Sequence, residues 1–366
     1  MPRLRTPPAL SLAALALALS ACRRPPDQPS AVATASPPAA KPAANAELDA
    51  GERRAVAVGA HTIGNPGPAI TLTTIDGDTI DLGAIYGTRP VYLKFWATWC
   101  IPCREQMPGF ERTFEAIGDR MTVIAVDTGL DDDVEAVRAF RQRFGLRMPI
   151  VVDDGRLAAA LDLEVTPQHV LIGRDARIAY VGHHDGEPLD RAIQDVLARP
   201  APSGPVAGHV MTLRPLRPGD VVHGLTATTL DGAAVPLGAS PDGRPRALVL
   251  FSVWCESYLK DSRPETSQAC RRVREAVDEL AAHGDVHWLG IAGNLWTSAE
   301  DVAEYRTKTA TRLPLAFDAD GSLLRAFGVH LMPTVVLIDR QGRIARVVGP
   351  DERDLAGAVR AVAGTP

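Results

Sequence analysis

The chain has 366 residues, of which 46% are hydrophobic, and a formal net charge of −5 at pH 7. This length and apolar content allow two domains of ordinary size with sizeable cores, together with tails. The mild acidity provides no basic surface of the kind that nucleic acids require, so nucleic-acid binding is excluded.

Residues 1–21 have the pattern of an export signal. Arg3 and Arg5 precede an apolar run over 9–21, which is shorter than the roughly 20 apolar residues of a membrane-spanning helix. The run ends in Leu19-Ser20-Ala21-Cys22, which is similar to a bacterial lipobox, so we expect Cys22 to be lipidated as the first residue of the mature protein. Ordinary cleavage nearby and an uncleaved signal anchor are the alternatives.

Residues 22–60 are rich in Pro and Ala and have almost no large apolar side chains. Such a segment buries too little surface to offset the entropy lost on ordering, so we predict a disordered tether between the lipid and the domains. Arg23 replaces the aspartate that retains lipoproteins at the inner membrane of enteric bacteria. This substitution favours an outer-membrane location, with the protein facing the periplasm.

A first domain is predicted over residues 64–199. Asp76-Gly77 is a turn dipeptide that indicates a hairpin, and Val134, Val137 and Phe140 recur at helical intervals. In chain order we expect a hairpin at 71–83, a strand at 91–96, a helix at 104–117 bent at Pro108, a strand at 121–127, a helix at 131–144, a hairpin at 165–182 and a helix at 189–197. This order predicts a three-layer α/β fold.

The strand expected at 91–96 leads to Trp99 and to two cysteines, Cys100 and Cys103, with two residues between them. Pro102 suits the first turn of a helix, which places Cys100 at or just before a helix N-terminus. Unpaired N–H groups and the helix dipole stabilise a thiolate there, and the thiolate is the reactive form of cysteine. Cys103 lies one turn further on, close enough to attack a mixed disulfide on Cys100, as thiol–disulfide exchange requires.

Other interpretations of the cysteine pair fit less well. A zinc site would need a second pair of ligands at suitable spacing, and the sequence offers none. Covalent haem attachment would need His after Cys103, where Arg104 stands. A purely structural disulfide is the third alternative, which the strand–Trp-Cys-x-Pro-Cys–helix context disfavours.

The sequence FWATWCIPC at 95–103, followed downstream by Thr166-Pro167, resembles the thioredoxin superfamily. The stretch CREQMP at 103–108 is similar to the bacterial periplasmic branch that includes TlpA, ResA and the cytochrome c maturation thioredoxins. The resemblance implies that Cys100 is the nucleophile, that Cys103 is the resolving thiol, and that a cis peptide precedes Pro167. It also implies that a client strand lies against Thr166.

Two positions depart from the pattern of these families. The periplasmic branch has Glu three residues after the second cysteine, where this chain has Gln106, with Glu105 just before it. Thioredoxin has a buried acid six residues before the first cysteine, where this chain has Lys94. A cation beneath the cysteines would favour the thiolate. Alternatively, Lys94 packs its stem and extends its amine to the surface.

Residues 200–219 contain several prolines and glycines and are predicted to be a linker. After them, TIDGDTIDLG at 74–83 recurs as TLDGAAVPLG at 229–238. Self-similarity at the scale of a domain predicts tandem thioredoxin-like folds, the second over 220–364. Each fold is expected to have a central mixed sheet flanked by helices.

The second copy has lost the cysteine pair. Trp254-Cys255 and Met332-Pro333 correspond to Trp99-Cys100 and Thr166-Pro167, but Tyr258 occupies the resolving position and Cys270 is the other thiol of this copy. On one straight helix Cys255 and Cys270 would lie about 22 Å apart, whereas a disulfide needs Cα atoms within about 7 Å. A break at 260–264 could fold the chain back, so the bond stays an open question. We expect this domain to dock clients or to shape the first site.

The remaining residues whose side chains could take part in chemistry are expected to have ordinary structural roles. His183-His184 is expected to be a solvated turn, His169 to pack, and the acidic run at 131–133 to cap a helix. His330, Met332 and Cys255 form an alternative soft copper site, but no metal site is predicted.

Together these features predict a lipid-anchored thiol–disulfide oxidoreductase that needs no cofactor and reduces exported client proteins through Cys100 and Cys103. The resemblance suggests apocytochrome c or copper-delivery proteins as clients and a membrane thiol carrier as the electron donor. The net direction depends on the partner, because the periplasm is oxidising.

Two alternatives stay open at this point. The first is a thiol peroxidase, because Ser252 stands three residues before Cys255, although Trp254 and the lack of an upstream proline disfavour it. The second is a non-enzymatic copper-binding or client-docking module centred on the second domain.

Overall fold

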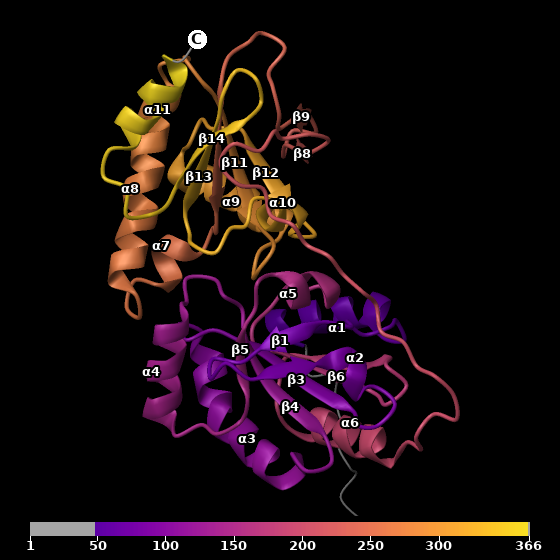
Figure 1. Cartoon of the computed structure of the whole chain (residues 1–366). Helices are drawn as coiled ribbons and strands as arrows, with labels where there is room; N and C mark the ends of the chain where they lie inside the picture. Colours follow the sequence, from indigo (N-terminus) through magenta and orange to yellow (C-terminus); the bar gives the residue numbers. More distant parts are fainter. Residues whose placement is uncertain (1–47, 365–366) are drawn as a thin grey trace, which may run out of the picture. The chain divides into compact units, whose positions relative to one another are not determined.

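The first sheet is organised by the strand that precedes the cysteine pair. In the computed structural model, which describes residues 48–364, this sheet has the strand order β5-β4-β3-β6-β7 (Figure 1). Its strands are β3 (Val91–Trp96), β4 (Thr122–Asp127), β5 (Ile150–Val152), β6 (Gln168–Ile172) and β7 (Ile178–Gly182). The central strand β3 pairs parallel with β4 and antiparallel with β6. All six of its residues are buried, as expected of a strand covered on both faces.

Two apolar layers enclose this sheet, because successive side chains of a strand point to opposite faces. Tyr92 and Trp96 join the layer formed with helices α3 (Ile101–Ile117), α4 (Val134–Phe144) and α6 (Glu187–Ala198). Leu93 and Phe95 join the layer formed with helices α1 (Ala50–Thr62), α2 (Leu82–Ile85) and α5 (Arg156–Ala160). A short hairpin of β1 (Thr71–Thr73) and β2 (Thr79–Asp81) precedes the sheet. We call residues 50–198 the N-terminal lobe.

Helix α1 corrects the predicted extent of the tether. Residues 50–60 were expected to be disordered, but they form a helix whose N-cap Asp49 accepts a hydrogen bond from the backbone N–H of Glu52 at 2.8 Å. Ala55 and Val58 are fully buried in the layer that also includes Val181 of β7. Small apolar residues therefore form a packed face without the large side chains by which such a face is usually recognised.

The signal over 1–21, Cys22 and the tether up to residue 47 lie outside the described residues. Within 48–364, no helix is both long enough and apolar enough to cross a membrane.

A second sheet repeats the connectivity of the first, with the order β12-β11-β10-β13-β14. Its strands are β10 (Arg246–Phe251), β11 (His287–Gly293), β12 (Leu315–Asp318), β13 (Thr334–Ile338) and β14 (Ile344–Val348). Around it lie the hairpin β8 (Thr226–Thr228) and β9 (Ala234–Pro236) and helices α7 (Cys255–Tyr258), α8 (Pro264–Ala281), α9 (Ala299–Thr309), α10 (Ser322–Ala326) and α11 (Leu355–Ala363). The central β10 again pairs parallel with one neighbour and antiparallel with the other, which confirms the predicted tandem fold. We call residues 226–363 the C-terminal lobe.

The helix after each central strand differs between the lobes. In the N-terminal lobe α3 begins at Ile101, three residues earlier than expected, and continues through Pro108. In the C-terminal lobe α7 is four residues long, and a new helix, α8, begins at Pro264. The break considered at 260–264 is therefore present, and the Cα atoms of Cys255 and Cys270 lie 6.3 Å apart.

The domain limits at 64–199 and 220–364 stay predictions. The described residues form one compact unit in which the two lobes are in contact.

Candidate active site

The Cys100–Cys103 disulfide lies at the start of α3, just after the end of the central strand β3. Cys100 is the N-cap of α3 and has an extended backbone, with Pro102 in the first turn. The two cysteines are bonded, with Cα atoms 5.2 Å apart. The backbone N–H of Cys103 points to Cys100 Sγ at 3.2 Å. One of the unpaired donors of the helix N-terminus is therefore already directed at the sulfur that would carry negative charge after reduction.

The loop before β6 supplies the other side of the disulfide. The Thr166-Pro167 peptide is cis, as the resemblance implies. Cys100 Sγ lies 3.5 Å from the Thr166 carbonyl oxygen, and Thr166 is fully buried. The structure thus brings Cys100, Cys103, Thr166 and Pro167 together.

A buried polar network lies on the α3 side of β3. Lys94 Nζ donates to Gln106 Oε1 at 3.0 Å, and His169 Nε2 lies 3.0 Å from the same oxygen. Since an amide oxygen only accepts, His169 carries its proton on Nε2, and its Nδ1 accepts from the Tyr92 hydroxyl at 2.7 Å. The Gln106 amide nitrogen donates to the His183 carbonyl at 3.2 Å. Gln106 therefore fixes both Lys94 and His169.

Burial determines the protonation of this network. Lys94 is fully buried, and burial lowers its pKa to about 7, although the Asp185 carboxylate acts in the opposite direction. Burial, together with the charge on Lys94, holds the pKa of His169 well below its usual value, so this ring stays neutral. The alternative in which Lys94 extends its amine to the surface is therefore wrong. Lys94 can exchange a proton near neutral pH, and it is among the residues that line a pocket of about 600 Å³.

The C-terminal lobe covers the disulfide. Cys100 and Trp99 are only 1% and 2% exposed. The Tyr258 hydroxyl accepts a hydrogen bond from the Ile101 N–H at 2.9 Å, at the start of α3. The Trp99 and Trp254 rings lie 5.0 Å apart, centroid to centroid. Apart from the repeated Trp-Cys, no feature of the sequence indicated this contact.

Two equivalent backbone hydrogen bonds join the lobes beside the two cis prolines. Trp296 N–H donates to the Glu164 carbonyl at 2.9 Å, and Asp131 N–H donates to the His330 carbonyl at 2.7 Å. Glu164 and His330 each stand three residues before the cis proline of their own lobe. Trp296 Nε1 also donates to Thr166 Oγ1 at 3.3 Å. Two polar groups beside the expected client groove, the Glu164 carbonyl and the Thr166 hydroxyl, are therefore bound by the chain itself.

The acidic run at 131–133 has three separate roles. Asp133 caps α4, as predicted, by accepting from the Ala136 N–H at 2.7 Å. Asp131 instead accepts from the Met332 N–H at 2.9 Å across the lobe contact. Asp132 accepts from the Thr98 N–H at 2.7 Å and is ion-paired with Arg263 of the other lobe at 2.5 Å. The helix-cap prediction is thus wrong for two of the three carboxylates, because they bind the lobes together.

The C-terminal lobe also has a disulfide, between Cys255 and Cys270. The Met332-Pro333 peptide is cis, and Cys270 Sγ lies 3.8 Å from the Met332 carbonyl oxygen. In this state Cys255 has no free thiolate to offer the alternative copper site with His330 and Met332.

His183 lies at the edge of the site rather than in a solvated turn. It is 4% exposed, and its Nδ1 lies 2.7 Å from the Pro167 carbonyl oxygen. His184 is exposed, as expected, and pairs with Asp49 at 2.8 Å. These three side chains bring potential ligand atoms within 4.8 Å of one another, so they are the group among the described residues that could hold a metal ion.

Comparisons with known families and proteins each match part of this chain. The AhpC/TSA family model matches residues 63–181. The thioredoxin-like protein YneN of Bacillus subtilis is 37% identical over 91 residues, which are 25% of this chain and 53% of that protein, so the match spans about half its length. The thiol–disulfide oxidoreductase ResA of Bacillus anthracis is 28% identical over 138 residues, covering 37% of this chain and 78% of ResA. A thioredoxin-like protein of Aeropyrum pernix, solved by crystallography, is 26% identical with a TM-score of 0.32, covering 35% of this chain and 89% of its own.

Proposed function

We propose that this chain is a TlpA/ResA-like thiol–disulfide oxidoreductase of the thioredoxin superfamily and that Cys100 and Cys103 are its redox pair. The similarity of residues 63–181 to the AhpC/TSA family and of part of the chain to ResA supports this proposal. One observation carries the proposal. Cys100 caps α3 with its sulfur directed between the Cys103 N–H and the Thr166 carbonyl. A thiolate in this position is stabilised by the helix N-terminus, and a client strand can pair with the backbone beside it once Trp296 is released.

The proposed reaction is the reduction of a client disulfide. The Cys100 thiolate attacks one client sulfur, a mixed disulfide forms, and the other client sulfur leaves as a thiolate. Cys103 then loses its proton and attacks Cys100 Sγ, which releases the second client thiolate and leaves the Cys100–Cys103 disulfide. A thiol donor at the membrane returns two electrons and two protons to the pair. No cofactor takes part in these steps.

In this proposal Lys94 accepts the proton that Cys103 loses. Lys94 lies on the same face of β3 as Tyr92 and Trp96, and these two residues pack in one cluster with Cys103 of α3. Its pKa of about 7 allows Lys94 to be neutral when the thiol ionises. Gln106 and His169 hold the amine in place. Lys94 would thus replace the carboxylates that the two related families place near their cysteines.

The location and partners are part of the same proposal. The export signal and Cys22 support a lipid-anchored protein that faces the periplasm, with the outer membrane preferred. Exported proteins with disulfides are the client class, and apocytochrome c and copper-delivery proteins are the examples suggested by the resemblance. The copper-binding and peroxidase alternatives both need a free thiol at Cys255, which is bonded to Cys270.

The first prediction tests the redox pair. Cys100→Ser should abolish the reduction of insulin disulfides, because the attacking sulfur is lost, while circular dichroism stays unchanged. Cys103→Ser should retain the attack and accumulate a mixed disulfide with the client, since the resolving thiol is missing. Undiminished insulin reduction by the Cys100→Ser chain would show that another group carries the reaction.

A further inference from the structure

The Cys255–Cys270 disulfide occupies the same place in its lobe as the Cys100–Cys103 disulfide in the other. Cys255 follows the central strand and Trp254, as Cys100 follows the central strand and Trp99. In each lobe a disulfide sulfur lies against the carbonyl that precedes a cis proline, at 3.8 Å from Met332 O for Cys270 and at 3.5 Å from Thr166 O for Cys100. The spacing in sequence has changed, whereas the position in the fold has not.

Both disulfides lie on the contact between the lobes. The four cysteines belong to one buried apolar cluster that also includes Trp99 and Leu259. Trp99 Nε1 donates to the Leu130 carbonyl, and Trp254 Nε1 donates to the Leu295 carbonyl, each at 2.8 Å. The residues after these two leucines make the lobe-to-lobe hydrogen bonds beside the cis prolines. Each redox position therefore faces the other across a pseudo-symmetric interface.

Two polar groups beside the expected client groove are already bound by a residue of the lobe that carries the second disulfide. While Trp296 binds the Glu164 carbonyl and the Thr166 hydroxyl, an external client cannot bind these two groups. The disulfide presented to Cys100 in this closed arrangement is consequently the one in the same chain.

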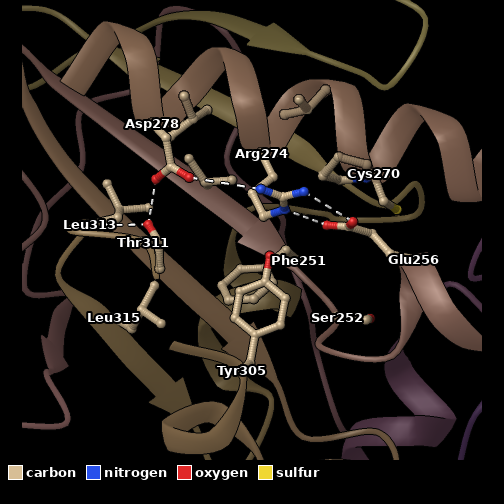
Figure 2. Close-up of a pocket in the computed structure, with 14 residues that line it drawn as sticks. Phe251, Ser252, Glu256, Cys270, Arg274, Asp278, Tyr305, Thr311, Leu313 and Leu315 are labelled. Carbon is tan, nitrogen blue, oxygen red and sulfur yellow. Dashed lines mark hydrogen bonds and ion pairs between the residues drawn. The ribbon is translucent and has the colours of Figure 1, made fainter. Parts of the chain in front are cut away.

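Cys270 lines a small pocket that contains a cation and room for water. Figure 2 shows Cys270 and Arg274 on one helix and lining one pocket, with the Arg274 guanidinium paired with Glu256 at 2.7 Å. The pocket has a volume of about 30 Å³, which is enough to hold a water molecule. The guanidinium favours a thiolate, whereas the carboxylates of Glu256 and Asp278 that pair with it act in the opposite direction.

We propose that Cys255–Cys270 is a second redox-active disulfide, reduced by the Cys100/Cys103 dithiol of the same chain. The Cys100 thiolate attacks one sulfur of the second disulfide, so that an intramolecular mixed disulfide forms and the other sulfur leaves as a thiolate. Cys103 attacks Cys100 Sγ and releases the remaining sulfur. The first pair ends oxidised and the second reduced, and an external dithiol supplies the two electrons. This proposal rests on the redox role of Cys100 and Cys103.

The test follows both pairs in the full chain. The oxidised protein is treated with one equivalent of dithiothreitol, quenched at intervals with an alkylating agent, and digested so that each cysteine is scored. We expect Cys255 and Cys270 to become thiols as the first pair is reoxidised. In a Cys100→Ser/Cys103→Ser chain their reduction should be at least about tenfold slower, because an internal reductant acts at about millimolar effective concentration.

Trapping supplies a second, independent measurement. A Cys103→Ser chain should form an internal disulfide from Cys100 to Cys255 or Cys270, found by non-reducing peptide mapping of the monomer. Equal reduction rates in the wild type and the double-serine chain, or a wild type that keeps Cys255–Cys270 intact beside a reduced first pair, would overturn the proposal. Insulin reduction by the same wild-type sample separates the two ideas. If insulin is reduced while the second pair is inert, only this inference fails. If neither insulin nor the second pair is reduced, the proposed function fails together with this inference.

Discussion

At the scale of single residues, Lys94 is the least usual feature of the site. A fully buried lysine bonded to an uncharged amide is costly when it is charged, and this cost is what lowers its pKa. We predict that Lys94→Met lowers kcat/KM for insulin reduction about a hundredfold near neutral pH, because the proton of Cys103 loses its acceptor. Lys94→Arg is the matched control, since arginine stays charged and cannot accept a proton. If the methionine chain retains full activity, Lys94 has no part in proton transfer.

The same lysine predicts a dependence of stability on pH. The unfolded chain keeps the proton on Lys94 up to a pKa of 10.5, whereas the folded chain loses it near 7. Between these values the unfolded state binds more protons, so the free energy of unfolding should rise with pH. Urea denaturation at both ends of this window should show the rise in the wild type and a weaker one in Lys94→Met. Parallel pH profiles for the two proteins would mean that Lys94 titrates normally.

The motif residues were predictable because local chain geometry fixes them. A strand end, a proline and a helix start place Cys100 and Cys103 without help from the rest of the fold. Gln106 and His183 were not identified as partners, because their contacts join α3, β6 and the turn after β7. Only the folded sheet brings these segments together, so no sequence spacing could have revealed them.

At the scale of elements, α1 tests whether the segment before residue 60 is part of the fold. Val58 is fully buried against the sheet, whereas Val56 on the same helix is 46% exposed. Val58→Ala should lower the free energy of unfolding by about 2 kcal/mol, because a buried side chain is removed and a cavity is left. Val56→Ala is the matched control and should change it by less than about 0.5 kcal/mol. Equal effects in denaturant titrations would show that α1 is not packed as described.

The repeat in the sequence predicted the order of strands and helices in both lobes, since hydrophobic period and turn residues are local signals. It did not predict α1, whose buried face consists of Gly51, Ala55, Val58, Gly59 and Thr62. Residues this small give a weak apolar pattern, and they pack only because β7 lies beneath them. The state of Cys255 and Cys270 stayed open for a related reason, since it depends on the angle at which the chain turns between α7 and α8.

At the scale of the whole molecule, the contact between the lobes decides which disulfide Cys100 can meet. The contact is built from Trp254, Tyr258 and Trp296, together with the carboxylates of Asp131 and Asp132. In sequence these residues stand in turns and in a degenerate motif, where aromatic and acidic side chains have no periodic pattern. Hydrophobic periodicity identifies the core of each lobe but not the surfaces that meet, so this contact could not be predicted.

Arg263 offers a way to open that contact without touching the redox pair. Its guanidinium binds the Asp131 carbonyl at 2.8 Å and the fully buried Asp132 carboxylate at 2.5 Å. Arg263→Met leaves that carboxylate without its cation and with only the hydrogen bonds from Thr98. A buried charge without its partner is unfavourable by about 3 kcal/mol or more unless the lobes separate and water reaches it. We therefore expect iodoacetamide to label Cys100 of the reduced chain about tenfold faster, and internal exchange to slow while insulin reduction speeds up. Arg191→Met, which removes an exposed pair with Glu187 on α6, is the matched control. An unchanged labelling rate in the Arg263 variant would mean that this ion pair does not hold the lobes over Cys100.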